Sequence, residues 1–321
     1  MLTIDRLTGK QGDGSFSATG TVDFNGMMDV DATANDIALG VFTGLAGVDE
    51  AVSGTASVTA HVGGTAQSPV ADVSLSAKDG GVRGGTFDAL AGEIQVRGSV
   101  VRVNQLTVHK YIDGVDYTAS VHGTLPLHAL TADADEMLSA AEQIDLTLSL
   151  DHADLSLLPV FSREIEWALG RTEGEVTIRG SLAAPRIKGS LRIRDGAVKL
   201  KAIETPITEI EVQVDALGDS IDIRECTGRM GTGSYLLTGH TGMSGLRPAN
   251  YEFMLVMNAL SVKTSFYDGP LTGALKLTED TYWGETLPKV SGTVDIDRAL
   301  ISIPTIPDTD SELPHIILDV G

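Results

Sequence analysis

Apolar and polar residues alternate strictly along many short segments of this chain. Ile144, Leu146, Leu148 and Leu150 occupy every second position of one segment, and acidic or hydroxyl side chains fill the positions between them. The same alternation recurs at residues 191–194, 210–214, 221–224, 275–277 and 294–296. Successive side chains of a β-strand point to opposite faces, so this pattern predicts strands with one apolar and one polar face. Such strands are typical of an antiparallel sheet that exposes one face to water.

Residues 180–198 show the fullest version of this pattern. They run through Gly, Pro, Gly and an alternating strand to the pair Asp195-Gly196, after which a new strand begins. Asp-Gly is favoured in two-residue hairpin turns, because both positions need a positive φ. We therefore predict a tight turn at this pair. Residues 64–82 repeat the same order of residues, and residues 288–301 repeat it loosely with a different pair at the turn.

A second motif, Gly-x-x-Gly-x-Gly-Ser-aromatic, occurs at residues 9–16 and again at residues 228–235. Together the two motifs indicate a long repeat of roughly 120 residues. We expect approximate repeats at residues 1–123, 124–240 and 241–321, the last of them partial. The strand pattern runs up to both ends of the sequence, so we expect a single elongated repeat segment of a larger protein.

Two segments interrupt the alternation and predict short helices. Residues 131–143 are acidic and rich in Ala. Residues 159–169 begin with a Pro and are followed by a Gly, which suit the first turn and the end of a helix. Phe161, Ile165 and Leu169 would share one apolar face of that helix. We expect this second helix to lie over the apolar face of the sheet as a lid.

The predicted fold class is therefore all-β, a long curled antiparallel repeat sheet with one or two short helices. With roughly 25 strands it would be on the order of 120 Å long. The 36 glycines and the aromatic content of 5% suit aliphatic strands that bend strongly. An exposed apolar face of this length would far exceed the patches that soluble monomers tolerate. Either a second sheet packs on it, or the sheet curls on itself, or the curled sheet holds an apolar ligand.

The third arrangement predicts a groove lined by the alternating aliphatic residues. The residues expected to line it are Val73, Leu75, Ile94, Val96, Val101, Val103, Ile144, Leu146, Leu148, Leu191, Ile193, Ile210, Val212, Ile221, Ile223, Leu275, Leu277, Val294 and Ile296. Such a lining favours an apolar ligand, because apolar surface of both the protein and the ligand is removed from water.

Charge and missing motifs exclude several classes of function. The chain has 321 residues and a net charge of −21, which argues against nucleic-acid binding and against electrostatic attachment to anionic lipid. Cys226 is the only cysteine, so neither a disulfide framework nor a cysteine zinc site is expected. The sequence lacks a nucleophile elbow, a phosphate-binding loop and a zinc-protease motif. We therefore expect no enzyme, no catalytic residue, no metal and no cofactor.

The motifs at residues 9–16, 180–198 and 228–235, with Leu-Pro-x-Ile-x-Leu-Asp-Val at 313–320, carry a resemblance to a known family. They resemble the periplasmic repeat region of the TamB family, the inner-membrane subunit of the translocation and assembly module. That family belongs with the AsmA-like and bridge-like lipid transfer proteins. The resemblance covers nearly the whole chain.

The resemblance implies a hydrophobic groove, called a β-taco, that conducts phospholipids between the inner and outer membranes of a diderm bacterium. It also implies a periplasmic location, an N-terminal inner-membrane anchor and an Omp85-type outer-membrane barrel partner, both reached through parts outside this sequence. Two alternatives stay open. One is a scaffold or chaperone for outer-membrane protein assembly or secretion, which would offer sheet edges to nascent strands. The other is a closed structural or adhesive β-repeat protein.

Overall fold

The computed structural model describes residues 1–23, 26–41, 52–65, 67–82, 85–130, 141–162, 164–244, 247–282 and 285–302. It confirms the all-β class, with 84% strand and one sheet of 18 antiparallel strands. The motif at 313–320 and most of the helix predicted at 131–143 lie outside the described residues.

The strands are β1 (Leu2–Gln11), β2 (Gly14–Val22), β3 (Met28–Ala38), β4 (Val52–Thr65), β5 (Ser68–Val82), β6 (Gly85–Arg97), β7 (Val100–Ile112), β8 (Val115–Pro126), β9 (Gln143–Asp154), β10 (Ile165–Ser181), β11 (Ala184–Leu200), β12 (Ile207–Gly218), β13 (Ser220–Met230), β14 (Gly233–Ser244), β15 (Arg247–Lys263), β16 (Tyr267–Tyr282), β17 (Glu285–Ile296) and β18 (Leu300–Ile301). Helical elements within the described residues include the 3-10 turns η1 (Leu127–Leu130) and η2 (Leu155–Leu157) and the short helix α2 (Leu158–Phe161).

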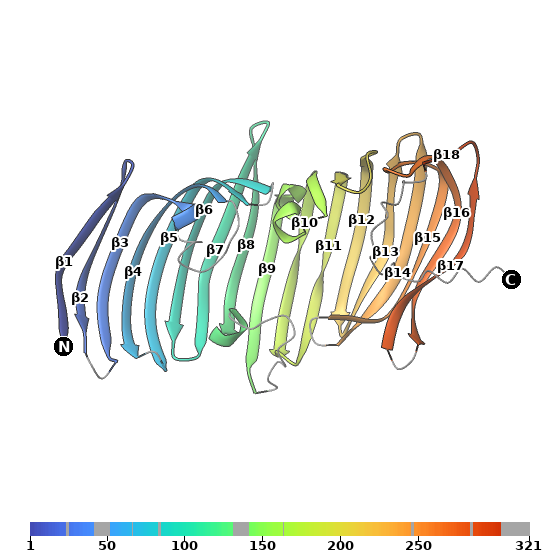
Figure 1. Ribbon diagram of the computed structural model, residues 1–321. Coiled ribbons are helices and arrows are strands. Elements are labelled where there is room, and N and C mark those ends of the chain that lie inside the picture. The colour runs from blue at the N-terminus through green and yellow to red at the C-terminus, as the bar shows by residue number, and fades with distance from the viewer. Residues whose placement is uncertain are drawn as a thin grey trace, which may run out of the picture.

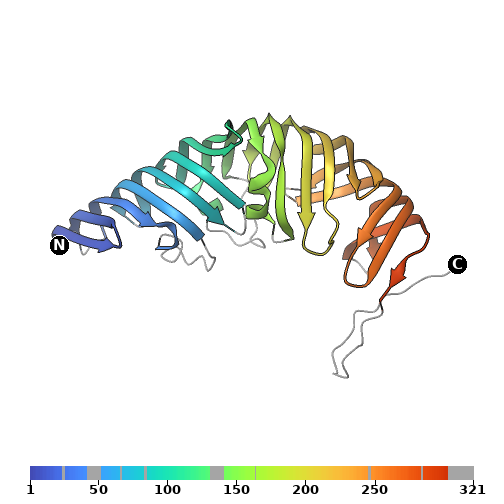
Figure 2. The same ribbon diagram turned by 90° about the horizontal axis from the view of Figure 1, so that it is seen from above.

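Each strand from β2 to β16 pairs antiparallel with the strands before and after it in sequence. β18 pairs with β16 beyond the end of β17, so it continues the line of β17. The chain is thus a meander of consecutive hairpins, with β1 at one end and β17 and β18 at the other (Figure 1). Seen from above, the sheet bends into an open arch (Figure 2) and is neither closed nor strongly curled.

The described residues contain 18 strands rather than the roughly 25 expected, because the strands are longer than the alternating segments suggest. β10, β11 and β15 have 17 residues each. At a spacing of about 4.8 Å, such a sheet extends for about 80 Å measured along the arch. The alternation thus predicted the type of element correctly but underestimated the length of each strand.

Asp195-Gly196 does not form the predicted hairpin turn. Both residues lie inside β11, where Asp195 has a φ of 51° and the register with β12 shifts on either side of Gly196. The pair therefore forms a β-bulge, and the Asp195 N–H donates to a carboxylate oxygen of Glu211 at 2.9 Å. Asp79 has the same φ inside β5. A bulge and a turn both use a residue of positive φ, so these residues alone do not distinguish the two.

The helix predicted at residues 159–169 is wrong beyond its first turn. α2 ends at Phe161, and β10 begins at Ile165, so both Ile165 and Leu169 are strand residues paired with β11. The apolar spacing fits a helix face, but short helices are only marginally stable without tertiary packing. The long ladder between β10 and β11 supplies backbone hydrogen bonds that a short helix cannot match.

The Gly-x-x-Gly-x-Gly-Ser-aromatic motifs form two matching hairpins. Gly9 of β1 pairs with Phe16 of β2, and Gly228 of β13 pairs with Tyr235 of β14. In both hairpins the aromatic ring lies over the glycine, and a Cβ on Gly228 would lie 2.7 Å from a carbon of the Tyr235 ring. The motif therefore pairs a glycine with the ring that covers it, a device that stabilises glycine in strands.

A buried hydrophobic cluster lies at the end of the sheet where the chain connects β11 to β12. The buried cluster there consists of Met230, Met257 and Leu260. Ile203 of the connection packs against this cluster. The Glu204 N–H donates to the carbonyl oxygen of Lys263 at 2.6 Å, and the two side chains form an ion pair at 2.7 Å. The connection is thus fastened to β15, three strands beyond β12.

Candidate functional site

One face of the sheet, named the apolar face from here on, carries aliphatic residues from β1 to β17. Leu148 of β9 pairs with Val121 of β8 and Val176 of β10, and Leu275 of β16 pairs with Leu255 of β15. Pairs of this kind continue the face from strand to strand. Strand register places all of the residues predicted to line a groove on this single face.

The apolar face is covered in some places and open in others. Val101 is 2% exposed and Ile210 is 7% exposed, as expected for core residues. Val290 and Ile296 of β17 are 62% and 55% exposed on the same face. All described strands belong to one sheet, so these open positions have no second sheet packed on them within the described residues. At these positions the apolar face is open to solvent, unlike the core of a globular domain.

Two hollows open on the apolar face at opposite ends of the sheet. The N-terminal hollow has a volume of about 340 Å³ and spans β2 to β4, with Phe16 and Val58 in its wall. The C-terminal hollow has a volume of about 370 Å³ and spans β13 to β17. Its wall consists of apolar residues, among them Ile223, Leu237, Phe253, Leu255, Leu277 and Val290. Both volumes lie at the lower end of the range for small-molecule sites.

The segment η2–α2 covers part of the middle of the sheet. Leu155 and Pro159 are buried, and both helical elements contact β10 and also β6, four strands away. Asp154 caps this segment, since its carboxylate accepts the N–H of Ser156 at 2.7 Å and that of Gly170 at 3.0 Å. The lid position expected for the helix at 159–169 is thus taken by a shorter segment that begins earlier.

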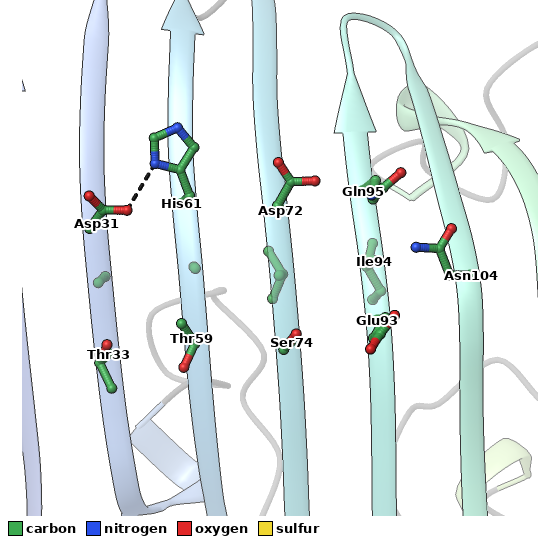
Figure 3. A pocket seen from close by; sticks show the side chains of 13 residues that line it. Asp31, Thr33, Thr59, His61, Asp72, Ser74, Glu93, Ile94, Gln95 and Asn104 are labelled. Carbon is green, nitrogen blue, oxygen red and sulfur yellow. Dashed lines mark hydrogen bonds and ion pairs between the residues drawn. The ribbon is translucent and has the colours of Figure 1, made fainter.

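The opposite face, named the polar face from here on, carries polar and charged side chains between β3 and β7. A shallow hollow of about 360 Å³ spans β3 to β7, and Figure 3 shows the carboxylates, hydroxyls and amides that border it. The Nδ1 atom of His61 lies 2.9 Å from a carboxylate oxygen of Asp31, and this hydrogen bond raises the pKa of the imidazole above its usual 6.5. The Nη2 of Arg97 donates to both carboxylate oxygens of Asp72, at 2.7 and 2.9 Å. Exposed pairs of this kind contribute little to stability.

The described residues contain no cluster of His, Cys, Asp and Glu suited to a metal ion. Cys226 lies on the apolar face with its Sγ 3.8 Å from the hydroxyl of Tyr235. Burial raises the pKa of both groups, so neither is poised to ionise near neutral pH. Among the described helices, none has the length and hydropathy of a membrane span.

Sequence reasoning missed several residues of the two hollows. Phe253 and Leu255 alternate with Glu252 and Met254 in β15, which is the signal that identified the other strands. Met254 interrupts this pattern because it is apolar and 48% exposed on the polar face. Phe16 belongs to a recognised motif, but its place in a hollow depends on pairing with β3.

No family model matches this chain, and neither a curated protein nor a solved structure does. The resemblance to the TamB family therefore stays a prediction that rests on the motifs quoted above.

Proposed function

We propose that this chain is a conduit segment that holds phospholipid acyl chains on its apolar face, in the periplasm of a diderm bacterium. The wider setting would be a translocation and assembly module, with an inner-membrane anchor and an Omp85-type barrel supplied by other parts of the assembly. The observation that carries the proposal is the apolar face itself, which continues from β1 to β17 and remains partly open.

The two hollows support a passive mechanism. Each offers a place where an acyl chain loses its contact with water, and the aliphatic pairs between them provide a similar environment along the sheet. A lipid that moves along such a face exchanges one apolar contact for another, so no step requires its chains to return to water. A strongly curled β-taco would shield the chains further, and we propose that lipid binding favours that closure.

A direct test compares aspartate substitutions of two exposed valines that lie on opposite faces of the sheet. Val290→Asp places a carboxylate in the C-terminal hollow, while Val256→Asp places one on the polar face of β15. Both valines are already exposed, by 62% and 43%, so both variants should fold. Phospholipid that copurifies with the protein is quantified by extraction and mass spectrometry.

We expect wild type and Val256→Asp to carry similar amounts of phospholipid and Val290→Asp to carry clearly less. If wild type carries no phospholipid, or if both variants carry as much as wild type, the proposal is wrong. Crosslinking of the purified protein to barrel precursors, without lipid, would favour the scaffold or chaperone alternative instead. The closed structural repeat is less well supported, because the sheet is open.

A further inference from the structure

A fourth hollow, named the rim hollow, lies at one edge of the sheet, near the end of β7, the start of β8, the end of β9, the start of β10 and the end of β11. It has a volume of about 320 Å³ and is bordered by Tyr117 of β8, Asp154 of β9, Arg171 of β10, and Arg194 and Asp195 of β11. Tyr117 continues the apolar positions of β8, whereas Arg171 and Arg194 lie on the polar face. The rim hollow therefore has both an apolar and a charged border.

The two arginines of the rim hollow form no ion pair with the described residues, although Asp154 and Asp195 border the same hollow. Arg171 and Arg194 are direct cross-strand partners, and like charges in this position repel each other. Asp154 pairs with Arg171 in register, but its oxygens accept the N–H groups of Ser156 and Gly170. Neither guanidinium has a hydrogen bond or an ion pair within the described part of the chain. Two adjacent guanidinium groups suit a phosphate, which accepts their N–H groups in pairs.

The same hollow also contains groups that favour a cation. Asp195 and Asp154 both border it, and the ring of Tyr117 offers a face on which an ammonium group binds favourably. A bare phosphate would be attracted by the arginines but repelled by the two carboxylates. A group that carries a phosphate and an ammonium together satisfies both sets of charges. This combination is the chemistry of a zwitterionic phospholipid head group.

We propose that the rim hollow binds the zwitterionic head group of a phospholipid whose acyl chains lie on the apolar face. Its phosphate contacts Arg171 and Arg194, and its ammonium group lies near Asp195 and Tyr117. This inference rests on the proposed function, because it names the class of lipid that the apolar face carries.

The test uses soluble probes that separate the two charges. Glycerophosphoethanolamine carries both groups, while glycerol 3-phosphate and inorganic phosphate carry only the anion. Binding to the whole chain is measured by calorimetry or by NMR shifts. The double variant Arg171→Gln/Arg194→Gln should bind glycerophosphoethanolamine at least about tenfold more weakly, since two charge-assisted hydrogen-bonding groups are lost. Arg186→Gln is the matched control, because Arg186 lies on β11 opposite Arg179 and outside the rim hollow.

Asp195→Asn tests the ammonium side without disturbing the bulge, because Asn also tolerates a positive φ. It should weaken glycerophosphoethanolamine binding and leave or improve the binding of glycerol 3-phosphate. Equal binding of all three probes to wild type would indicate a simple anion site and overturn the proposal. Unchanged binding to the arginine double variant would overturn it as well.

The two proposals can fail separately. Phospholipid that copurifies in equal amount and head-group composition with wild type and Arg171→Gln/Arg194→Gln would contradict the rim site and leave the conduit intact. Glycerophosphoethanolamine binding that requires both arginines, in a protein that carries no phospholipid, would support the rim site and contradict the conduit. Vesicles of phosphatidylethanolamine and of phosphatidylglycerol complete the comparison, since only the first should deliver lipid in a way that depends on Asp195.

Discussion

Leu260 and Val290 lie on the same face of one sheet, yet truncating each to Ala should cost very different amounts of stability. Leu260 is 5% exposed and packs with Met230 and Met257, so Leu260→Ala should cost about 2–5 kcal/mol. Val290 is 62% exposed. Full burial of a valine contributes roughly 2 kcal/mol, and less than half of that is present at this position, so Val290→Ala should cost less than about 1 kcal/mol.

The measurement is urea unfolding followed by circular dichroism, combined with hydrogen exchange of the amides in β15 and β17. Hydrogen exchange is needed because a sheet of consecutive hairpins does not have to unfold in one step. We expect Leu260→Ala to weaken the protection of β15 strongly and Val290→Ala to change that of β17 only slightly. Val256→Ala, on the polar face and 43% exposed, provides the control for loss of an exposed valine.

A similar large cost for Leu260→Ala and Val290→Ala would refute the reasoning. It would mean that Val290 is covered in solution, by a second copy or by another part of the chain. The apolar face would then be an ordinary core, and the conduit would lose the observation that supports it.

Three further outcomes follow from single contacts. Asp31→Asn should return the raised pKa of His61 toward 6.5 in an NMR titration; protonated His61 adds stability below pH 6.5 that is lost as the pH rises through its folded pKa. Gly189→Ala should destabilise β11 by about 1–3 kcal/mol in thermal unfolding, because Gly189 has a φ of 141° and its Cβ would meet the carbonyl oxygen of Glu175. Burial raises the pKa of Cys226, so a disulfide reagent at pH 7 should modify it much more slowly in the folded protein than in urea.

The sequence predicted the faces of the sheet well, because a period of two is a local property of a strand. Ile144, Leu146 and Leu148 share the apolar face in the structure, as their spacing requires. The repeat of the motif that ends in Phe16 could likewise be found from the sequence. Its physical cause, a ring that covers the glycine on the paired strand, became clear only from the register.

The errors arose wherever distant strands decide the outcome. Asp195 has the positive φ expected of it, but pairing with β10 and β12 turns the site into a bulge rather than a hairpin. Ile165 and Leu169 have helical spacing, but the ladder with β11 makes them strand residues. The rim hollow was unpredictable for the same reason, because the opposition of Arg171 and Arg194 depends on the shifts that bulges introduce into the register.

Because each strand pairs with its neighbours in sequence, the effect of a deletion depends on whether an even or an odd number of strands is removed. Deleting one hairpin, such as β6 and β7, should shorten the sheet by about 10 Å and leave every later strand with its direction and apolar side unchanged. Deleting a single strand would reverse all later strands, and the meander could continue only with their apolar side chains turned to the opposite side. The matching hairpins agree with this rule: β13 follows β1 by twelve strands, and β11, with its Asp195 bulge, follows β5 by six. A sheet of this kind can change its length freely, but only in pairs of strands.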